Sequence, residues 1–226
     1  MATKASRTPL TRERVLAAAV AIADAEGVKA LTMRRLAADL DVEAMSLYYH
    51  LPAKEALLDG VVETVLGEIC AAVAAREPAE DWRAAIRERF LTAREVMLRH
   101  PWAPVLLGSR RAVPPIVYAY YDGIVATLVG GGFSYRLAHR ALHAFGSMAL
   151  GFAQEIFSPA NAGGTTETDT AEEDLAAMAA AVPHLTAMVA AEVHDAGDPM
   201  LGWCDSQVEF EFTLDLLLDG LARLRG

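Results

Sequence analysis

Residues 31–54 read LTMRRLAADLDVEAMSLYYHLPAK. Thr32 is a good N-cap for a short helix that runs to Leu40. Asp41-Val42 then forms a tight turn, since Asp tolerates left-handed geometry better than most residues. A second short helix follows over residues 43–50, and Pro52 ends it because proline disfavours helix in the residue before it. Two short helices joined by a tight turn form a helix-turn-helix.

The helix-turn-helix needs a small apolar core on one side and a free face on the other. The core candidates are Leu36, Ala37, Leu40, Val42, Leu47 and Leu51. Short side chains at the start of the second helix permit close approach to bases, and the Tyr and His residues near its end suit phosphate oxygens. Arg34 can reach a guanine edge, and Thr32 and Lys54 lie at helix N-termini that favour phosphate. The predicted DNA contacts are Thr32, Arg34, Ala44, Met45, Ser46, Tyr48, Tyr49, His50 and Lys54. The competing interpretation is that residues 48–50 merely cover the next helix.

The rest of the chain is also predicted to be helical. Thr11 caps a first helix that Gly27 ends, and a long apolar helix follows over residues 54–75. Further helices are expected at about 81–99, 103–109, 114–130, 134–157, 171–193 and 203–224. Residues 208–216 alternate like a strand, but Phe210, Leu214, Leu217, Leu221 and Leu224 also follow heptad spacing. A lone strand cannot satisfy its backbone, so a helix is preferred there.

Composition excludes several classes of protein. The chain has 226 residues with 54% hydrophobic residues and a net charge of −10, which is too apolar for a disordered chain. Cys70 and Cys204 are too few for a disulfide framework or a cysteine-rich zinc site. No signal-peptide core or membrane span is apparent, which predicts a soluble cytoplasmic protein with no membrane partner. Residues 1–55 carry +1 and the remainder −11, which suggests a basic contact region joined to an acidic body.

The run from Leu31 to Asp59 resembles the DNA-binding domain of the TetR family, including the Leu-Tyr-aromatic-His run and the Lys54 that precedes Ala-Leu-Leu-Asp. The resemblance implies an all-α homodimer with an N-terminal domain (1–55) that binds a palindromic operator. It also implies a helical domain (56–226) for dimerisation and effector binding, with the effector releasing DNA. Asp41 replaces the usual turn Gly, and Ala44 and Met45 replace polar or rigid residues, so a different operator is expected. The resemblance implies a regulator, most often a repressor, and no enzyme.

The effector is expected to differ from tetracycline. Leu106 and Ser147 stand where tetracycline repressors use His to hold a drug–magnesium chelate, and Leu cannot ligate a cation. A drug-sized apolar site with a few polar tips is expected instead, with ordinary core packing as the alternative. Its predicted lining is Met97, Trp102, Leu106, Tyr118, Tyr121, Phe145, Ser147, Met148 and Phe152. No metal or cofactor is expected, although His139 and His143 have ligand spacing.

Two other functions stay open at this stage. One is a DNA-binding protein without an effector. The other is a small-molecule carrier or enzyme with an incidental N-terminal bundle, although the chain has no nucleophile elbow and no phosphate loop.

Overall fold

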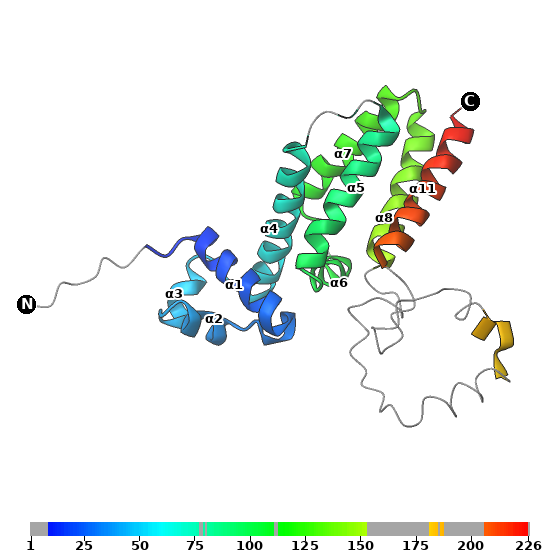
Figure 1. Cartoon of the computed structure of the whole chain (residues 1–226). Helices are drawn as coiled ribbons and strands as arrows, with labels where there is room; N and C mark the ends of the chain where they lie inside the picture. Colours follow the sequence, from blue (N-terminus) through cyan, green and yellow to red (C-terminus); the bar gives the residue numbers. More distant parts are fainter. Residues whose placement is uncertain are drawn as a thin grey trace, which may run out of the picture. The chain divides into compact units, whose positions relative to one another are not determined.

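The computed structural model describes residues 9–76, 79, 81–110, 113–152, 181–184, 186–187 and 206–225 (Figure 1). Its contacts divide the chain into two compact units, which are described separately. The first unit comprises Met1–Ala144 with Arg225–Gly226, and the second comprises Phe145–Leu224. All regular secondary structure in the described residues is helical, which confirms the predicted all-α class. The predicted division into residues 1–55 and 56–226 concerns function and stays a prediction.

The first unit begins with the helix-turn-helix. The N-terminal part of this unit contains α1 (Arg12–Glu26), the short 3-10 helix η1 (Val28–Ala30), α2 (Met33–Asp39) and α3 (Ala44–Tyr48). Helices α2 and α3 form the helix-turn-helix. The predicted caps are confirmed: the Thr11 hydroxyl accepts from the Arg14 N–H, and the Thr32 hydroxyl accepts from the Arg35 N–H.

The predicted helix end at Gly27 and the predicted left-handed turn at Asp41 are confirmed as well. Gly27 has φ of 80° where α1 ends, and Asp41 has φ of 52° in the turn between α2 and α3. An Asp in this region is unusual but tolerated, because its short polar side chain can hydrogen-bond locally. We call residues 12–51 the head.

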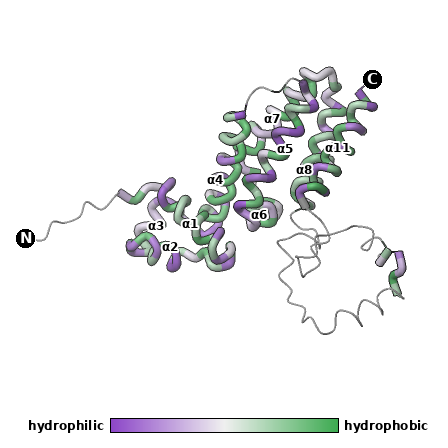
Figure 2. The backbone as a smooth tube through the Cα atoms, in the orientation of Figure 1, coloured by the Kyte–Doolittle hydropathy of each residue, from purple (hydrophilic) through white to green (hydrophobic). Residues whose placement is uncertain are grey.

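Four further helices form the body of the first unit: α4 (Lys54–Ala74), α5 (Trp82–Arg99), α6 (Ala103–Ser109) and α7 (Pro115–Gly130). Hydrophobic residues run along most of α4 (Figure 2), because this helix packs against both the head and α5. One continuous core extends from Leu16 in α1 through Val61 in α4 to Leu106 in α6. The head therefore has no separate hydrophobic core, because its core is continuous with that of the body.

Gly60 sets how closely α1 approaches α4. A Cβ atom at Gly60 would lie 2.6 Å from Leu16 Cδ2, which is well inside van der Waals contact. The glycine thus allows the two helices to cross with the Leu16 side chain seated directly on the α4 backbone.

Helix α8 (Tyr135–Gly151) passes from the first unit into the second, and α11 (Ser206–Leu224) belongs to the second. The disputed residues 208–216 lie inside α11, so the helical interpretation is confirmed. Most of the predicted helix at 171–193 lies outside the described residues.

The predicted heptad seam of α11 is only partly correct. The buried stripe is Phe210, Leu214, Leu218 and Leu221, while Leu217 is half-buried and Leu224 is exposed. An α-helix has 3.6 residues per turn, so successive steps of four keep Leu218 rather than Leu217 on the stripe. The second apolar stripe, Val208, Phe212 and Leu216, is exposed, and the two stripes together produce the alternation in the sequence.

None of the described helices combines the length and the hydropathy needed to cross a bilayer. The described residues also contain no cluster of three or more His, Cys, Asp or Glu side chains arranged to hold a metal ion. His139 and His143 pack edge to face, with ring centroids 4.7 Å apart.

Candidate nucleic-acid interface

Helix α3 buries one side chain and exposes its neighbours. Leu47 is fully buried and anchors the helix to the head core. On the other faces Met45 is 71% exposed and Tyr49 is 90% exposed, and Tyr48 is also exposed. Ala44, Ser46 and His50 are half-buried at the rim. The predicted reading face of α3 is thus open, as insertion into a major groove requires.

The two adjacent arginines of α2 differ sharply in their surroundings. Arg35 bridges Glu26 at 2.6 Å and Asp39 at 3.3 Å, and the bond to Glu26 raises the pKa of its guanidinium. Arg34 is exposed and makes no ion pair or hydrogen bond with any residue that the structure describes. Arg35 therefore holds α2 to α1, whereas the forked donors of Arg34 are available to a base edge.

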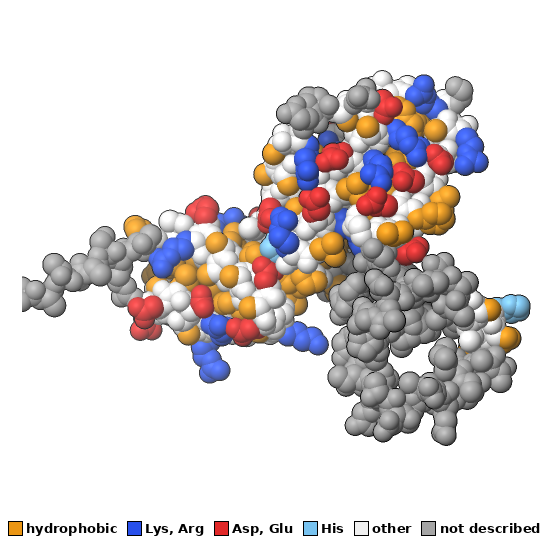
Figure 3. Space-filling model, in the orientation of Figure 1, with side chains coloured by type: hydrophobic (Ala, Val, Ile, Leu, Met, Phe, Trp, Pro, Cys, Tyr) orange, Lys and Arg blue, Asp and Glu red, His pale blue; other side chains and the backbone are white. Residues whose placement is uncertain are grey.

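The remaining predicted contacts lie at helix starts. Thr32 and Lys54 are exposed, Thr32 at the N-cap of α2 and Lys54 at the first residue of α4. No side chain that the structure describes caps the N-terminus of α4. Free helix N-terminal N–H groups favour phosphate. Basic and acidic side chains mingle on the face seen in Figure 3, consistent with the small net charge of residues 1–55.

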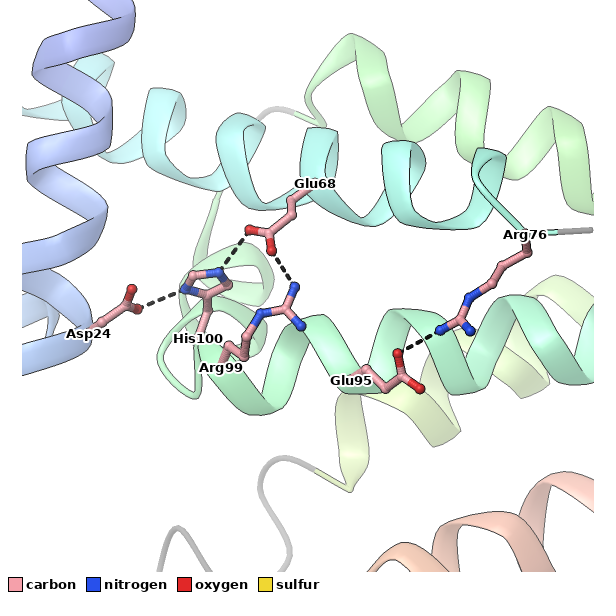
Figure 4. A network of polar contacts seen from close by, with 6 residues as sticks. All are labelled: Asp24, Glu68, Arg76, Glu95, Arg99 and His100. Carbon is pink, nitrogen blue, oxygen red and sulfur yellow. Dashed lines mark hydrogen bonds and ion pairs between the residues drawn. The ribbon is translucent and has the colours of Figure 1, made fainter.

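A polar network joins the head to the body (Figure 4). Asp24 Oδ1 in α1 accepts from Trp102 Nε1 at 2.7 Å and lies 2.8 Å from His100 Nδ1. The other ring nitrogen of His100 lies 3.0 Å from Glu68 Oε2 in α4, and Glu68 also pairs with Arg99. The hydrogen bond from Arg99 is the main reason that the pKa of Glu68 is lowered.

The number of hydrogen bonds that His100 makes in this network depends on which of its ring nitrogens carry protons. Each carboxylate oxygen can only accept, so both contacts are hydrogen bonds at once only when both ring nitrogens carry protons. His100 is buried, and the loops and helices it joins come from three distant segments of the chain. In its imidazolium form the residue ties α1, α4 and the end of α5 together.

A second link lies where the head meets α4. Arg110, directly after α6, donates to Asp59 Oδ1 at 2.7 Å and to Glu55 Oε2 at 2.6 Å. The Arg110 side chain is only 11% exposed, whereas Glu55 is 71% and Asp59 is 45% exposed, so the guanidinium is shielded but its carboxylate partners face water. Both partners lie in the first turns of α4, so α6 is fastened to the segment that follows α3.

The predicted effector-site residues fall in different places. Trp102 and Leu106 are buried in the shared core, with Met97 half-buried against it, and Tyr118 and Tyr121 are exposed on α7. In the second unit Phe145 and Met148 are buried and Ser147 is exposed. Phe152 there stacks edge to face on Phe210, with ring centroids 5.2 Å apart. An effector role for these residues stays a prediction.

Sequence reasoning missed the side chains that join head and body. The sequence predicts Trp102 only as a pocket residue and gives no signal for Asp24, Glu68 or His100. Asp24 and Trp102 are 78 residues apart in the chain, and Arg110 and Asp59 are 51 apart. No local pattern of residues signals contacts of that range.

Comparison with known proteins identifies the family. Residues 15–61 match the model of "Bacterial regulatory proteins, tetR family", and residues 75–225 match "Tetracyclin repressor-like, C-terminal domain". The class A tetracycline repressor from transposon 1721 of Escherichia coli is 30% identical over 96% of this chain and 93% of its own length. An HTH-type transcriptional regulator of Saccharopolyspora erythraea is 37% identical over 132 residues, or 58% of this chain. That match spans only about half of the relative's length, as does the match to a repressor of Streptomyces coeruleorubidus.

Solved structures agree with the sequence matches. A possible TetR family transcriptional regulator of Streptomyces coelicolor has a TM-score of 0.76 and 30% identity, covering 94% of this chain and 99% of that one. The ActR protein of the same species, solved in complex with actinorhodin, has a TM-score of 0.73 and 28% identity, covering 97% and 100%. The relatives' names are those of transcriptional regulators rather than enzymes. The chain belongs to the TetR family of bacterial transcriptional regulators.

Proposed function

We propose that the chain is a repressor that binds a palindromic operator as a homodimer and releases it when a small molecule binds the body. The observation that carries the proposal is the exposed face of α3 on a head with a buried core. Beside it, Arg34 is exposed and pairs with no residue that the structure describes. Such a regulator acts where the chromosome is, so the proposal includes a cytoplasmic location. It includes no resident metal or cofactor.

The exposed stripe of α11 supports dimerisation. Phe212 is 59% exposed, and Val208 and Leu216 are similarly open, each four residues from the next. Residues spaced by four lie on one helical face, so the three side chains form a continuous apolar strip. Strips of this kind commonly pack as helix bundles, and a second copy of the same chain presents the matching strip. A symmetric pair of heads then reads two half-sites about 34–36 Å apart.

We expect effector binding to release DNA through α4, because this helix is bonded to α6 and to the end of α5. The helix begins at Lys54, four residues after the predicted DNA contact His50, and Arg110 and Glu68 fasten it to α6 and to the end of α5. An effector that shifts these body helices would therefore move the heads. Ligand and operator then oppose each other through a coupling free energy, typically about 1–3 kcal/mol. The solved complex of ActR with actinorhodin supports a small-molecule effector in this proposal.

Selection of bound duplexes from a random pool tests the proposal. The enriched sequence should be an inverted repeat, and fluorescence anisotropy then measures binding to it and to a scrambled duplex. Arg34→Ala should relax the preference at one base position by about 1–3 kcal/mol. Lys54→Ala should weaken binding to all sequences alike and lower the salt dependence.

A matched control removes the same charge elsewhere on the head. Lys29 is exposed on η1 and is not a predicted contact, so Lys29→Ala should leave operator preference unchanged. Enrichment of no repeat at all, or equal losses from Arg34→Ala and Lys29→Ala, would contradict the proposed reading head.

A further inference from the structure

Two hydroxyl groups in the body are buried without a hydrogen-bond partner. They are Thr92 Oγ1 in α5 and Tyr120 Oη in α7, and no residue that the structure describes bonds to either. Thr92 is 1% exposed, and the Tyr120 hydroxyl is buried although the residue as a whole is only partly buried. An unsatisfied buried polar group costs about 1–3 kcal/mol, and native proteins hold only a few. Such groups therefore call for a partner.

A cation lies over the ring of Tyr120 and on the same helix as Thr92. The Arg89 guanidinium carbon is 5.3 Å from the centre of the Tyr120 ring, and Arg89 is one helical turn from Thr92. Among the described residues no carboxylate pairs with Arg89. Gly123 makes room for it, because a Cβ there would lie 3.1 Å from Arg89 Nη1. The guanidinium thus rests on the α7 face that carries Tyr120.

The protonation of the neighbouring groups defines what this cluster can bind. Burial raises the pKa of the Tyr120 hydroxyl well above its ordinary value of 10.0, so at neutral pH it keeps its proton and can donate. Burial also raises the pKa of the Cys70 thiol, which leaves no anion there to neutralise Arg89. Two hydroxyl donors and one unpaired cation complement a group with several acceptor oxygens and a negative charge.

We propose that Arg89, Thr92 and Tyr120 form the polar end of the effector site and select an aromatic ligand that carries an oxyanion, such as a carboxylate. The aromatic part follows from the surroundings, since the Tyr120 ring packs on the apolar core with Tyr121 6.3 Å away between ring centres. The inference rests on the proposed function for its biological meaning. The binding chemistry itself is testable without DNA.

Two fluorescent dyes that differ only by one sulfonate group provide the test. The anionic probe is 8-anilinonaphthalene-1-sulfonate, and its neutral partner is N-phenyl-1-naphthylamine, which lacks the sulfonate. Arg89→Gln should weaken the anionic dye about 10-fold or more and the neutral dye less than about 3-fold. Tyr120→Phe and Thr92→Val should each weaken the anionic dye by about 3- to 10-fold. Tyr135→Phe, on the exposed face of α8 and outside the predicted effector site, should change neither.

A stability measurement separates a ligand site from a structural role. If the hydroxyls await a ligand, Tyr120→Phe and Thr92→Val remove an unsatisfied group, and the melting temperature of the unliganded protein should stay equal or rise. If ordered water satisfies them instead, both variants should melt lower with no selective loss of the anionic dye, and the proposal is overturned. Failure of the anionic dye to bind, or equal losses for both dyes, also overturns it.

Operator binding of the same variants keeps the two proposals apart. All three should bind operator normally in the absence of dye, because none lies in the head. Absence of operator binding by the unmodified protein would sink the proposed function while leaving the dye result intact. Normal operator binding, together with equal losses of the anionic and neutral dyes in the variants, would overturn the inference and leave the proposed function intact.

Discussion

Replacing Asp24 with Ala is the sharpest test of the link between head and body. The substitution removes two hydrogen bonds to one carboxylate oxygen, from Trp102 at 2.7 Å and from His100 at 2.8 Å. Hydrogen bonds to a charged group contribute about 1.5–3 kcal/mol each. The lower value applies because the Asp24 side chain is 31% exposed, which gives a loss of about 3 kcal/mol in the free energy of unfolding. Trp102, only 8% exposed, is also left without an acceptor.

Urea unfolding followed by circular dichroism measures this loss, at one fixed protein concentration because a dimer's stability depends on it. Asp39→Ala is the matched control: its carboxylate pairs with Arg35 at 3.3 Å on an exposed face, and its loss should be about 0.5 kcal/mol or less. A double-mutant cycle with Trp102→Phe should give a coupling energy of about 1 kcal/mol. Equal losses from Asp24→Ala and Asp39→Ala, or full additivity with Trp102→Phe, would refute the reasoning.

Three other perturbations test separate parts of the structure. Phe212→Glu on the exposed stripe of α11 should convert a dimer to monomers by sedimentation and abolish operator binding; an unchanged dimer would exclude this stripe as the interface. Glu68→Gln should destabilise the protein at neutral pH, but the difference should shrink as pH falls below 4.5, since the lowered pKa of Glu68 gives stability that protonation removes; a constant difference between pH 7 and pH 3 would contradict this. Gly60→Ala should cost about 1–3 kcal/mol in urea unfolding because Leu16 must move, whereas Gly67→Ala, with 3.8 Å of room, should cost nothing or stabilise.

The helix-turn-helix was predictable because its determinants are local. Thr32 caps α2 by bonding an N–H three residues away, and Asp41 adopts the left-handed turn within the same segment. Such interactions depend on short stretches of chain, so the sequence alone places them. The α11 stripes were less predictable. The pattern of Phe210 and Leu214 fits both heptad and 3.6-residue spacing, and only packing selected Leu218 over Leu217 for burial.

The sequence by itself determined the class of the fold, the position of the helix-turn-helix and the family, since each depends on patterns within a few turns of chain. Tertiary structure alone decided which of the paired arginines is engaged, because Arg35 finds Glu26 only when α2 folds back on α1. It also decided that Asp24 meets His100, and that the Tyr120 ring lies beside Arg89 while no described residue bonds to its hydroxyl. Electrostatics and burial act between residues that are close in space, and chain closure brings distant residues together in ways no local pattern encodes.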